Sequence, residues 1–174
     1  MDVFEAIKGR RSVRAFKRRG ISAEIVEKLV EAALWAPSAG NIQPWEFVIV
    51  RKPKIKKRLA EAAFGQAFIE EAPVVIVVCA NETRSLQGYG VRGKKLYCLQ
   101  DTAAAIQNLH LAAYSLGLGT CWIGAFREDA AKEILSTPEG IRPVAIIPVG
   151  YPDEAPPLRR RRRPTSQIVH YETF

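Results

Sequence analysis

The feature that most constrains the fold is a run of seven apolar residues from Pro73 to Cys79. The run consists mainly of β-branched valine and isoleucine, and it shows no alternation of polar and apolar positions, which is typical of a strand buried on both faces. Such a strand belongs in the centre of a sheet. With 174 residues, of which 48% are hydrophobic and 25% charged, the chain is long enough to bury a core of this kind. We expect one globular domain over residues 1–174.

Hydrophobic periodicity and capping signals predict further elements around this strand. Helices are predicted at residues 2–8, 22–34, 54–63, 68–71, 96–116 and 129–135, and strands at residues 45–50, 120–123, 144–149 and 167–171. The helix at 96–116 is apolar on more than one face, which indicates burial under the sheet or against a second subunit. Residues 81–95 are predicted to form a polar loop that acts as a mobile lid.

That loop contains the sequence Gly88-Tyr89-Gly90-Val91-Arg92-Gly93, a match to the G-x-G-x-x-G pattern. In a Rossmann fold this motif directly follows its strand, and an acidic residue about twenty positions later binds the ribose. Here roughly eight residues separate the strand from the motif, and the positions about twenty further on are apolar. The match therefore does not predict a dinucleotide site.

The net charge of +8 is concentrated in two segments. Residues 1–20 hold seven basic and two acidic side chains, and Arg159 to Arg163 add five positive charges, so the rest of the chain carries −2. Focal charge of this kind indicates either a nucleic-acid surface or a pocket where both segments meet a multivalent anion. Stacking aromatic residues are not interleaved with the arginine runs, which disfavours the nucleic-acid surface.

Two short segments carry the residue types of a binding site. If residues 10–16 are extended, alternation points Arg10, Ser12 and Arg14 to one side, where they suit phosphate oxygens. The second segment, Trp35 to Trp45, is a turn between a helix and a strand, rich in proline, glycine and short polar side chains. From these residues alone, a solvated basic loop and an ordinary connection remain open as alternatives.

Cysteine usage and the chain's apolar runs predict a cytoplasmic protein without membrane association. Cys79, Cys98 and Cys121 are odd in number and lack C-x-x-C spacing, so we expect buried, reduced thiols and no metal site. The first residues lack the order of a signal peptide, and the longest apolar run, 72–80, is too short to span a bilayer. His110 and His170 are expected to be structural.

Four motifs, taken together and in order, resemble the FMN-dependent nitroreductase family. They are Arg10-Arg11-Ser12-Val13-Arg14-Ala15-Phe16, Ala36-Pro37-Ser38-Ala39-Gly40-Asn41-Ile42-Gln43-Pro44-Trp45, Gly119-Thr120-Cys121-Trp122-Ile123-Gly124, and Gly150-Tyr151-Pro152 followed by a basic segment. The resemblance covers essentially the whole chain. It implies an α+β fold with a central mixed, mostly antiparallel β-sheet flanked by helices. It also implies an intertwined homodimer that exchanges its C-terminal segments and binds FMN at the interface.

The resemblance further implies which residues bind FMN. One subunit would supply Arg10, Arg11, Ser12 and Arg14, and the other would supply Pro37, Ser38, Ala39, Asn41 and Gln43. Further contacts would come from Gln66 at the pyrimidine edge, from the backbone of Ile123, Gly124 and Ala125 near the flavin N5, and from Arg160 and Arg162. Which of Arg159 to Arg163 face the flavin stays open.

As a function, the resemblance implies ping-pong transfer of two electrons from NADH or NADPH through FMN to a nitroaromatic, a quinone or a similar small-molecule acceptor. Hydride passes between nicotinamide and flavin, so no catalytic side chain is expected, and a cation such as Arg14, Arg160 or Arg162 would stabilise negative charge on the reduced ring. The family also includes dehalogenases, cyclic-imine oxidases and a flavin-cleaving enzyme, which remain alternatives. Nucleic-acid binding by the basic segments is a less favoured one.

Overall fold

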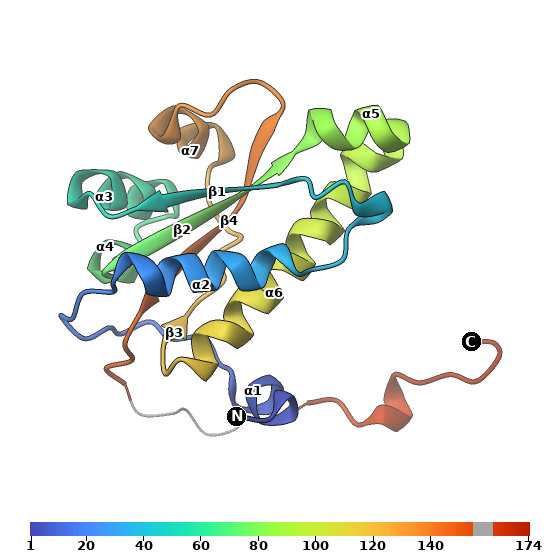
Figure 1. Ribbon diagram of the computed structural model, residues 1–174, viewed down its shortest axis with the longest axis horizontal. Helices are drawn as coiled ribbons and strands as arrows, with labels where there is room; N and C mark the ends of the chain where they lie inside the picture. Colours follow the sequence, from blue (N-terminus) through green and yellow to red (C-terminus); the bar gives the residue numbers. More distant parts are fainter. Residues whose placement is uncertain (155–161) are drawn as a thin grey trace.

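The computed structural model describes residues 1–154 and 162–174 and centres on a four-stranded antiparallel sheet with the order β1-β2-β4-β3 (Figure 1). The strands are β1 (Trp45–Val50), β2 (Val74–Asn81), β3 (Gly119–Thr120) and β4 (Ile141–Gly150). The predicted central strand is confirmed, because β2 lies between β1 and β4 and is buried from Val74 to Ala80. Ser12 adds a single parallel bridge to Thr120.

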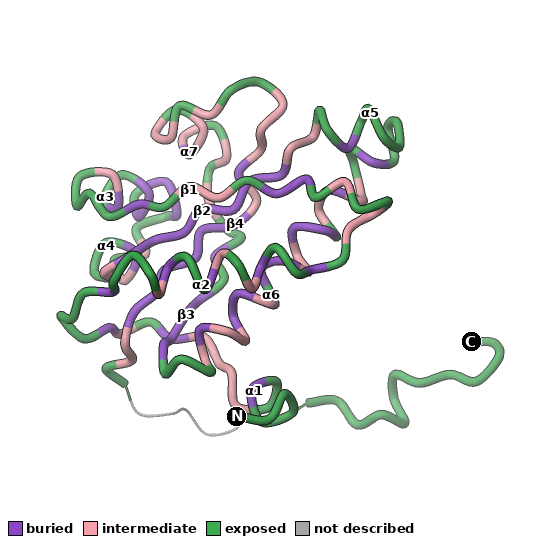
Figure 2. Tube along the Cα trace, in the orientation of Figure 1, coloured by how far each residue is buried: buried purple, intermediate pink, exposed green. Residues whose placement is uncertain are grey.

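Helices cover both faces of the sheet, as the apolar character of β2 requires. Val74, Ile76 and Val78 point to the face covered by α2 (Ala23–Leu34) and α6 (Cys98–Ser115). The alternate residues of β2 point to the face covered by α3 (Pro53–Ala62), α4 (Phe68–Glu71) and α7 (Glu128–Leu135). The sheet and the inner sides of these helices form the buried interior (Figure 2). The α+β class is therefore confirmed.

The predicted lid at residues 81–95 is wrong. The segment forms helix α5 (Glu82–Arg92), kinked at Tyr89 and Gly90, and a π-helical turn, η2 (Gly93–Tyr97), joins it to α6. Asn81 caps α5 by accepting a hydrogen bond from the Arg84 amide at 2.9 Å, and Lys94 pairs with Glu82 at 3.5 Å. Capping and packing against neighbouring elements outweigh the low helix propensity of the segment's glycines.

The predicted strand at 167–171 is also wrong. Residues 162–174 contain only a short 3₁₀ turn, η3 (Thr165–Gln167), and they extend away from the sheet with exposed side chains (Figures 1 and 2). Their hydrogen bonds are local, for example from the Val169 amide to the Thr165 carbonyl at 2.9 Å. A strand needs a paired edge, and no other part of the described chain lies along this segment.

Other predicted elements hold with shifted bounds. The strand predicted at 120–123 is reduced to β3, and Ile123 bridges separately to Ile146. β4 is longer than predicted and contains Pro143, which lies where the register with β2 shifts, as a bulge allows. α1 (Val3–Gly9) packs on the C-terminal half of α6, with Gly9 against Tyr114.

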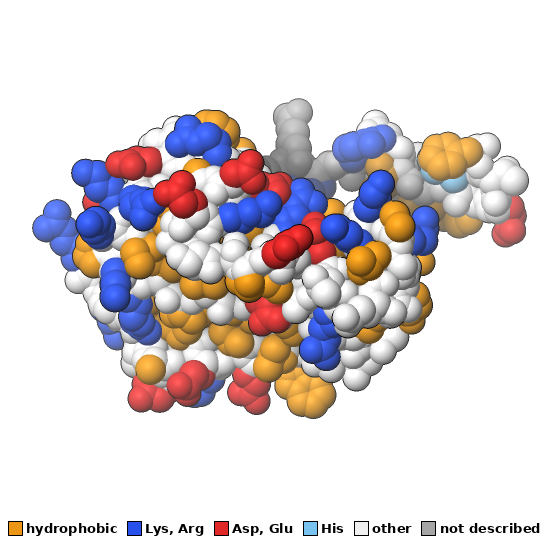
Figure 3. Space-filling view, turned by 90° about the horizontal axis from the view of Figure 1, so that it is seen from above, with side chains coloured by type: hydrophobic (Ala, Val, Ile, Leu, Met, Phe, Trp, Pro, Cys, Tyr) orange, Lys and Arg blue, Asp and Glu red, His pale blue; other side chains and the backbone are white. Residues whose placement is uncertain are grey.

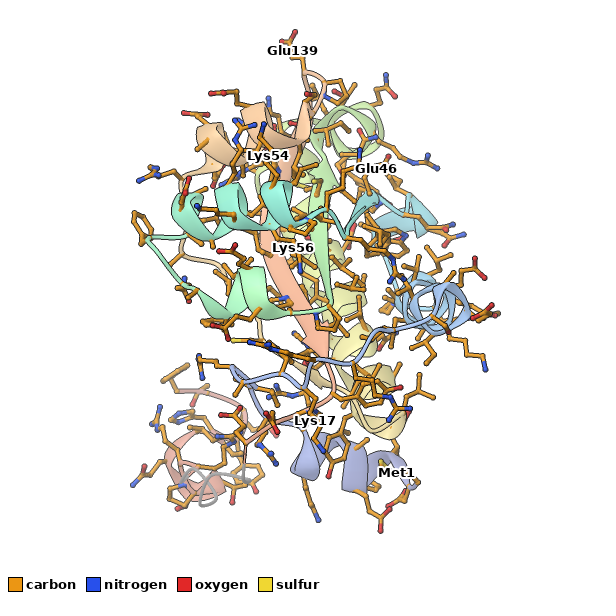
Figure 4. All side chains as sticks on the ribbon, turned by 90° about the vertical axis from the view of Figure 1, so that its left-hand side faces the viewer. Met1, Lys17, Glu46, Lys54, Lys56 and Glu139 are labelled. Atoms are coloured by element: carbon orange, nitrogen blue, oxygen red, sulfur yellow. The ribbon has the colours of Figure 1, made fainter. Side chains whose placement is uncertain are left out.

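The three cysteines are buried and free of disulfides, and burial raises the pKa of the Cys79 thiol to about 12. Lys56 belongs to α3, and its buried side chain donates a hydrogen bond to the Ala72 carbonyl, at the end of α4, at 2.6 Å (Figure 4). In residues 1–154 and 162–174, no helix combines the length and apolarity needed to cross a membrane.

Acidic and basic side chains intermingle on the face that Figure 3 shows. Ion pairs include Arg58 with Glu133 at 3.2 Å, between α3 and α7, and Arg142 with Glu128 at 2.7 Å. The basic segment of residues 1–20 lies elsewhere: Lys17 is at the opposite end of the molecule from Glu139 (Figure 4). The net charge of +5 in residues 1–20 therefore lies toward that end.

Candidate functional site

Residues 10–16 leave α1 and run beside β3 in an extended conformation, as predicted. The Val13 amide donates to the Thr120 carbonyl at 2.9 Å, and Val13 and Phe16 are buried while Arg14 is exposed. A side chain at Gly119 would place its Cβ 2.6 Å from a Val13 methyl group, so the close approach of the two segments requires glycine. Alternation therefore places Arg10, Ser12 and Arg14 on the side of the segment opposite to Val13.

The guanidinium groups of Arg10 and Arg14 have no ion-pair or hydrogen-bond partner within residues 1–154 and 162–174. The Arg14 main-chain amide donates to the Glu154 carboxylate at 2.8 Å, which fixes the backbone. The Arg14 guanidinium lies 5.9 Å from the centre of the Phe68 ring, a cation–π distance. Both cations are therefore available for an anion.

His110 lies on α6 next to this segment. Its Nδ1 is 2.7 Å from the Thr120 hydroxyl, and its Nε2 is buried without a partner among the described residues. Burial together with the Arg10 charge lowers its pKa to about 4. A neutral imidazole that contacts Thr120 fits a structural role. His170 differs: it is exposed and stacks on Phe174 with ring centres 4.2 Å apart.

Gln66 and the segment 123–125 are the residues expected at the flavin ring. Gln66 is half-buried, donates to the Ala63 carbonyl at 2.9 Å, and stands two residues before Phe68. Ile123 is buried and its amide donates to the Ile146 carbonyl at 3.0 Å. The next two residues, Gly124 and Ala125, are exposed, and their amides donate to no acceptor in the described ranges.

The turn that connects α2 to β1, residues 36–44, has a strained backbone. Gly40, Asn41 and Gln43 all have positive φ, at 54°, 55° and 55°. Within the turn the Gln43 amide donates to the Ser38 hydroxyl at 3.0 Å, and the Gln43 side chain donates to Asn41 Oδ1 at 3.2 Å. Non-glycine residues in this region of φ cost free energy and concentrate at functional sites.

Residues of helices α5 and α6 contact the turn at residues 36–44, and the sequence did not indicate these residues as functional. The Ala39 amide donates to Asp101 Oδ1 at 3.1 Å, and Arg84 Nε donates to the Ile42 carbonyl. A Cβ at Gly40 would lie 2.5 Å from the Tyr89 hydroxyl. A single acidic residue within the apolar pattern of α6 was the only sequence signal for Asp101.

The two halves of the predicted site do not meet within one chain. Asp101 of α6 contacts the turn, whereas Tyr114 of α6 contacts Gly9, next to Arg10. The two residues are 13 positions apart, which corresponds to about 20 Å of helix at about 1.5 Å per residue. In Figure 1 the turn lies beside α5 at one end of α6, and β3 lies near the other end of α6. Arg160 lies outside the described residues, and Arg162 is exposed in the C-terminal segment.

Apolar side chains are exposed around the turn. Trp35 is 82% exposed and borders an open groove of about 570 Å³, which is lined by Glu31, Leu34, Trp35, Ala36, Pro37, Asn41 and Gln43. A second exposed apolar group, Val3, Phe4 and Ile7 of α1, lies at the other end of α6. Large apolar side chains gathered in this way mark surfaces that another molecule covers.

Comparison with known proteins identifies the family. The model of the "Nitroreductase family" matches residues 7–68 and 63–151. The chain belongs to the nitroreductase family. A "Putative NADH dehydrogenase/NAD(P)H nitroreductase" of Methanothermobacter thermautotrophicus is 38% identical over 164 residues, covering 91% of this chain and 82% of that protein.

Two further nitroreductase relatives bear on chemistry. The structure of the NADPH:FMN oxidoreductase of Vibrio harveyi complexed with NAD⁺ superposes with a TM-score of 0.90 at 28% identity, covering 99% of this chain and 77% of that one. The iodotyrosine deiodinase of Haliscomenobacter hydrossis is 30% identical over 198 residues, covering 97% of this chain and 89% of that protein. The predicted family, fold and oxidoreductase class are confirmed, and the site residues remain predictions.

The donor set of this nitroreductase-family chain fits FMN. Arg10 and Arg14, whose guanidinium groups have no partner in residues 1–154 and 162–174, alternate with Ser12 along one extended segment, which suits a phosphate group. The free amides of Gly124 and Ala125 suit an acceptor atom of a flat ring. The strained turn adds the Asn41 and Gln43 amides, provided that a second subunit brings it to the arginines.

Proposed function

We propose that the protein is an FMN-dependent oxidoreductase. It transfers two electrons in a ping-pong cycle from NADH or NADPH to a small-molecule acceptor such as a nitroaromatic or a quinone. The observation that carries this proposal is the pair of guanidinium groups of Arg10 and Arg14, which have no partner in the described part of the chain and flank Ser12 on one extended segment. The V. harveyi oxidoreductase supports the choice of flavin and nicotinamide.

Each group of residues has a distinct role in this proposal. Arg10 and Ser12 bind the phosphate, and Arg11, whose Nη2 donates to the Glu154 carbonyl at 3.4 Å, anchors the segment. Arg14 supplies a fixed positive charge, and the amides of Gly124 and Ala125 donate to the ring. FMN, when bound, supplies hydride transfer at N5, so the protein has only to orient donor, flavin and acceptor.

We further propose a cytoplasmic homodimer, with FMN bound between the subunits. The turn with Pro37, Ser38, Ala39, Asn41 and Gln43 would reach the flavin bound by Arg10, Ser12 and Arg14 of the other subunit. Two observations support this arrangement: within one chain the turn and the arginine segment contact opposite ends of α6, and Trp35 beside the turn is exposed. If the two subunits exchange residues 162–174, this exposed segment, which includes Arg162, would pack on the surface of the other subunit.

An absorbance spectrum of the purified protein, with and without added FMN, tests the proposal. We expect a bound-flavin spectrum that is bleached by NADH or NADPH under anaerobic conditions and restored by a nitroaromatic or a quinone. Arg10→Ala should lose the flavin, and Arg18→Ala, which removes an equal charge from the same segment, should keep it. A colourless protein that fails to bind added FMN would contradict the proposal.

A dehalogenase reaction on the same flavin is the second candidate, because the H. hydrossis relative is an iodotyrosine deiodinase. The discriminating measurement is iodide release from an iodinated phenol by the anaerobically reduced protein, compared with its reduction of a nitroaromatic. Iodide release without nitroaromatic reduction would favour the dehalogenase and overturn the first choice of acceptor.

A further inference from the structure

Asp101 is the only acidic side chain buried within the described residues, with 7% of its surface exposed. One carboxylate oxygen, Oδ1, accepts the Ala39 amide at 3.1 Å, and the other, Oδ2, is buried and has no hydrogen-bond partner among the residues that the structure describes. No Lys or Arg in the described ranges forms an ion pair with it. Its single hydrogen bond therefore goes to the turn at residues 36–44.

Stability alone does not explain a carboxylate at this position. A buried charge with one hydrogen bond and no counter-ion costs free energy, and burial accordingly raises the pKa of Asp101, opposed by the Ala39 amide. The start of α6 is not a free helix N-terminus that would stabilise the charge, because η2 continues directly into α6. Residues that break such rules are expected where they position a functional site.

The contact acts at the start of the strained part of the turn. Ala39 opens the 3₁₀ turn η1 (Ala39–Asn41), and the next two residues, Gly40 and Asn41, take positive φ. A strained conformation persists only where surrounding contacts define it. Ser38 binds the end of the turn through the Gln43 amide, and Asp101 binds its beginning.

We propose that Asp101 is a positioning residue for FMN: by accepting the Ala39 amide it holds the turn in the conformation that presents Asn41 and Gln43 to the flavin. The proposal rests on the function proposed above and adds to it a residue that does not itself touch the cofactor. Its effect on FMN passes through one hydrogen bond to the backbone.

The test compares three variants by FMN titration of the apoprotein, followed by flavin fluorescence. Asp101→Leu keeps the approximate size and removes the acceptor, so we expect the dissociation constant to rise about tenfold. Asp101→Asn keeps an acceptor and should stay within about twofold of the wild type. Thr102→Val is the matched control, because the Thr102 hydroxyl is equally buried but donates to the Cys98 carbonyl, within its own helix.

A second measurement does not involve FMN. Hydrogen exchange of the peptide covering residues 36–45 in the apoprotein should be faster in Asp101→Leu and unchanged in Asp101→Asn and Thr102→Val. If Asp101→Leu does not fold, Ala39→Pro removes the donor instead. Proline is compatible there, because Ser38 already has the extended φ and ψ of −142° and 153° that precede proline.

The outcomes separate this inference from the proposed function. A wild-type protein that binds no FMN overturns the proposed function, and hydrogen exchange then decides alone whether Asp101 holds the turn. If the wild type binds FMN and the acceptor-free or donor-free variant binds it equally well, the positioning role is overturned and the proposed function stands. Equal losses in Asp101→Asn and Asp101→Leu also overturn it, since the asparagine retains the acceptor.

Discussion

His110 Nδ1 lies 2.7 Å from the hydroxyl of Thr120, and Thr120 bridges in turn to Ser12 of the proposed phosphate-binding segment. The imidazole is 2% exposed, and its pKa falls to about 4 because of burial and the nearby Arg10 charge. The same Arg10 that we assign to the phosphate thus helps to keep His110 neutral. This relationship makes the stability of the protein depend on pH.

Between the ordinary histidine pKa of 6.5 and about 4, the unfolded chain binds a proton that the folded chain does not. Acidification through that window should therefore lower the free energy of unfolding, by about 3 kcal/mol if His110 acts alone. Urea denaturation at pH 7.5 and pH 4.5 measures the change, and His110→Gln should reduce it. An equal pH dependence in both proteins would assign the effect to other groups.

Replacing Arg10 by alanine should weaken FMN binding by about 10- to 100-fold, because a charge-assisted hydrogen bond contributes about 1.5–3 kcal/mol. Equilibrium titration of the apoprotein measures this. Arg18→Ala controls for net charge, since Arg18 is exposed in the same basic segment. Equal weakening in both variants would show a general electrostatic effect and no specific phosphate contact.

Asn41 combines an exposed amide with a positive φ of 55°, and two substitutions separate these properties. Asn41→Gly tolerates the backbone conformation and loses only the amide, whereas Asn41→Ala should also lower the free energy of unfolding by about 1 kcal/mol. We expect both variants to bind FMN more weakly and only the alanine variant to melt earlier. Unchanged flavin affinity in both would remove Asn41 from the site.

Asp101→Asn should stabilise the apoprotein at neutral pH. Burial raises the pKa of Asp101, so the favourable contribution of its protonated form is present at low pH and is lost as the pH rises through the folded-state pKa. The melting temperature of the asparagine variant should therefore exceed that of the wild type at pH 8, and the difference should shrink toward pH 4. A difference independent of pH would show that ionisation of Asp101 is not its cause.

The proposed dimer predicts a mass in solution of twice 19.3 kDa. Trp35→Glu places a charge on the exposed apolar surface beside the turn, so light scattering should show a shift toward monomer together with loss of FMN. Lys54→Glu introduces the same residue on α3, across the sheet, and should remain dimeric (Figure 4). A monomeric wild type that retains FMN would contradict the interface site.

Much of this protein follows from its sequence alone. The apolar run at β2 shows no alternation of polar and apolar residues, so it requires burial on both faces of the strand. The apolar stripe of α2 and its N-cap at Ser22 are also local signals. Val13 of the segment 10–16 is buried, as its apolar character indicates, and its amide pairs with the Thr120 carbonyl. The family could likewise be identified from motif order.

Other features depend on partners distant in the sequence, and only the tertiary structure decided them. Residues 81–95 have weak helix propensity and read as a loop, but Lys94 with Glu82 and the packing against the turn make them helical. Residues 167–171 have strand propensity, but without a neighbouring edge they form no strand. The bond from Ala39 to Asp101 spans 62 positions. Propensity is set by a residue and its neighbours in the chain, whereas a buried carboxylate acquires its role from a backbone amide that only folding brings to it.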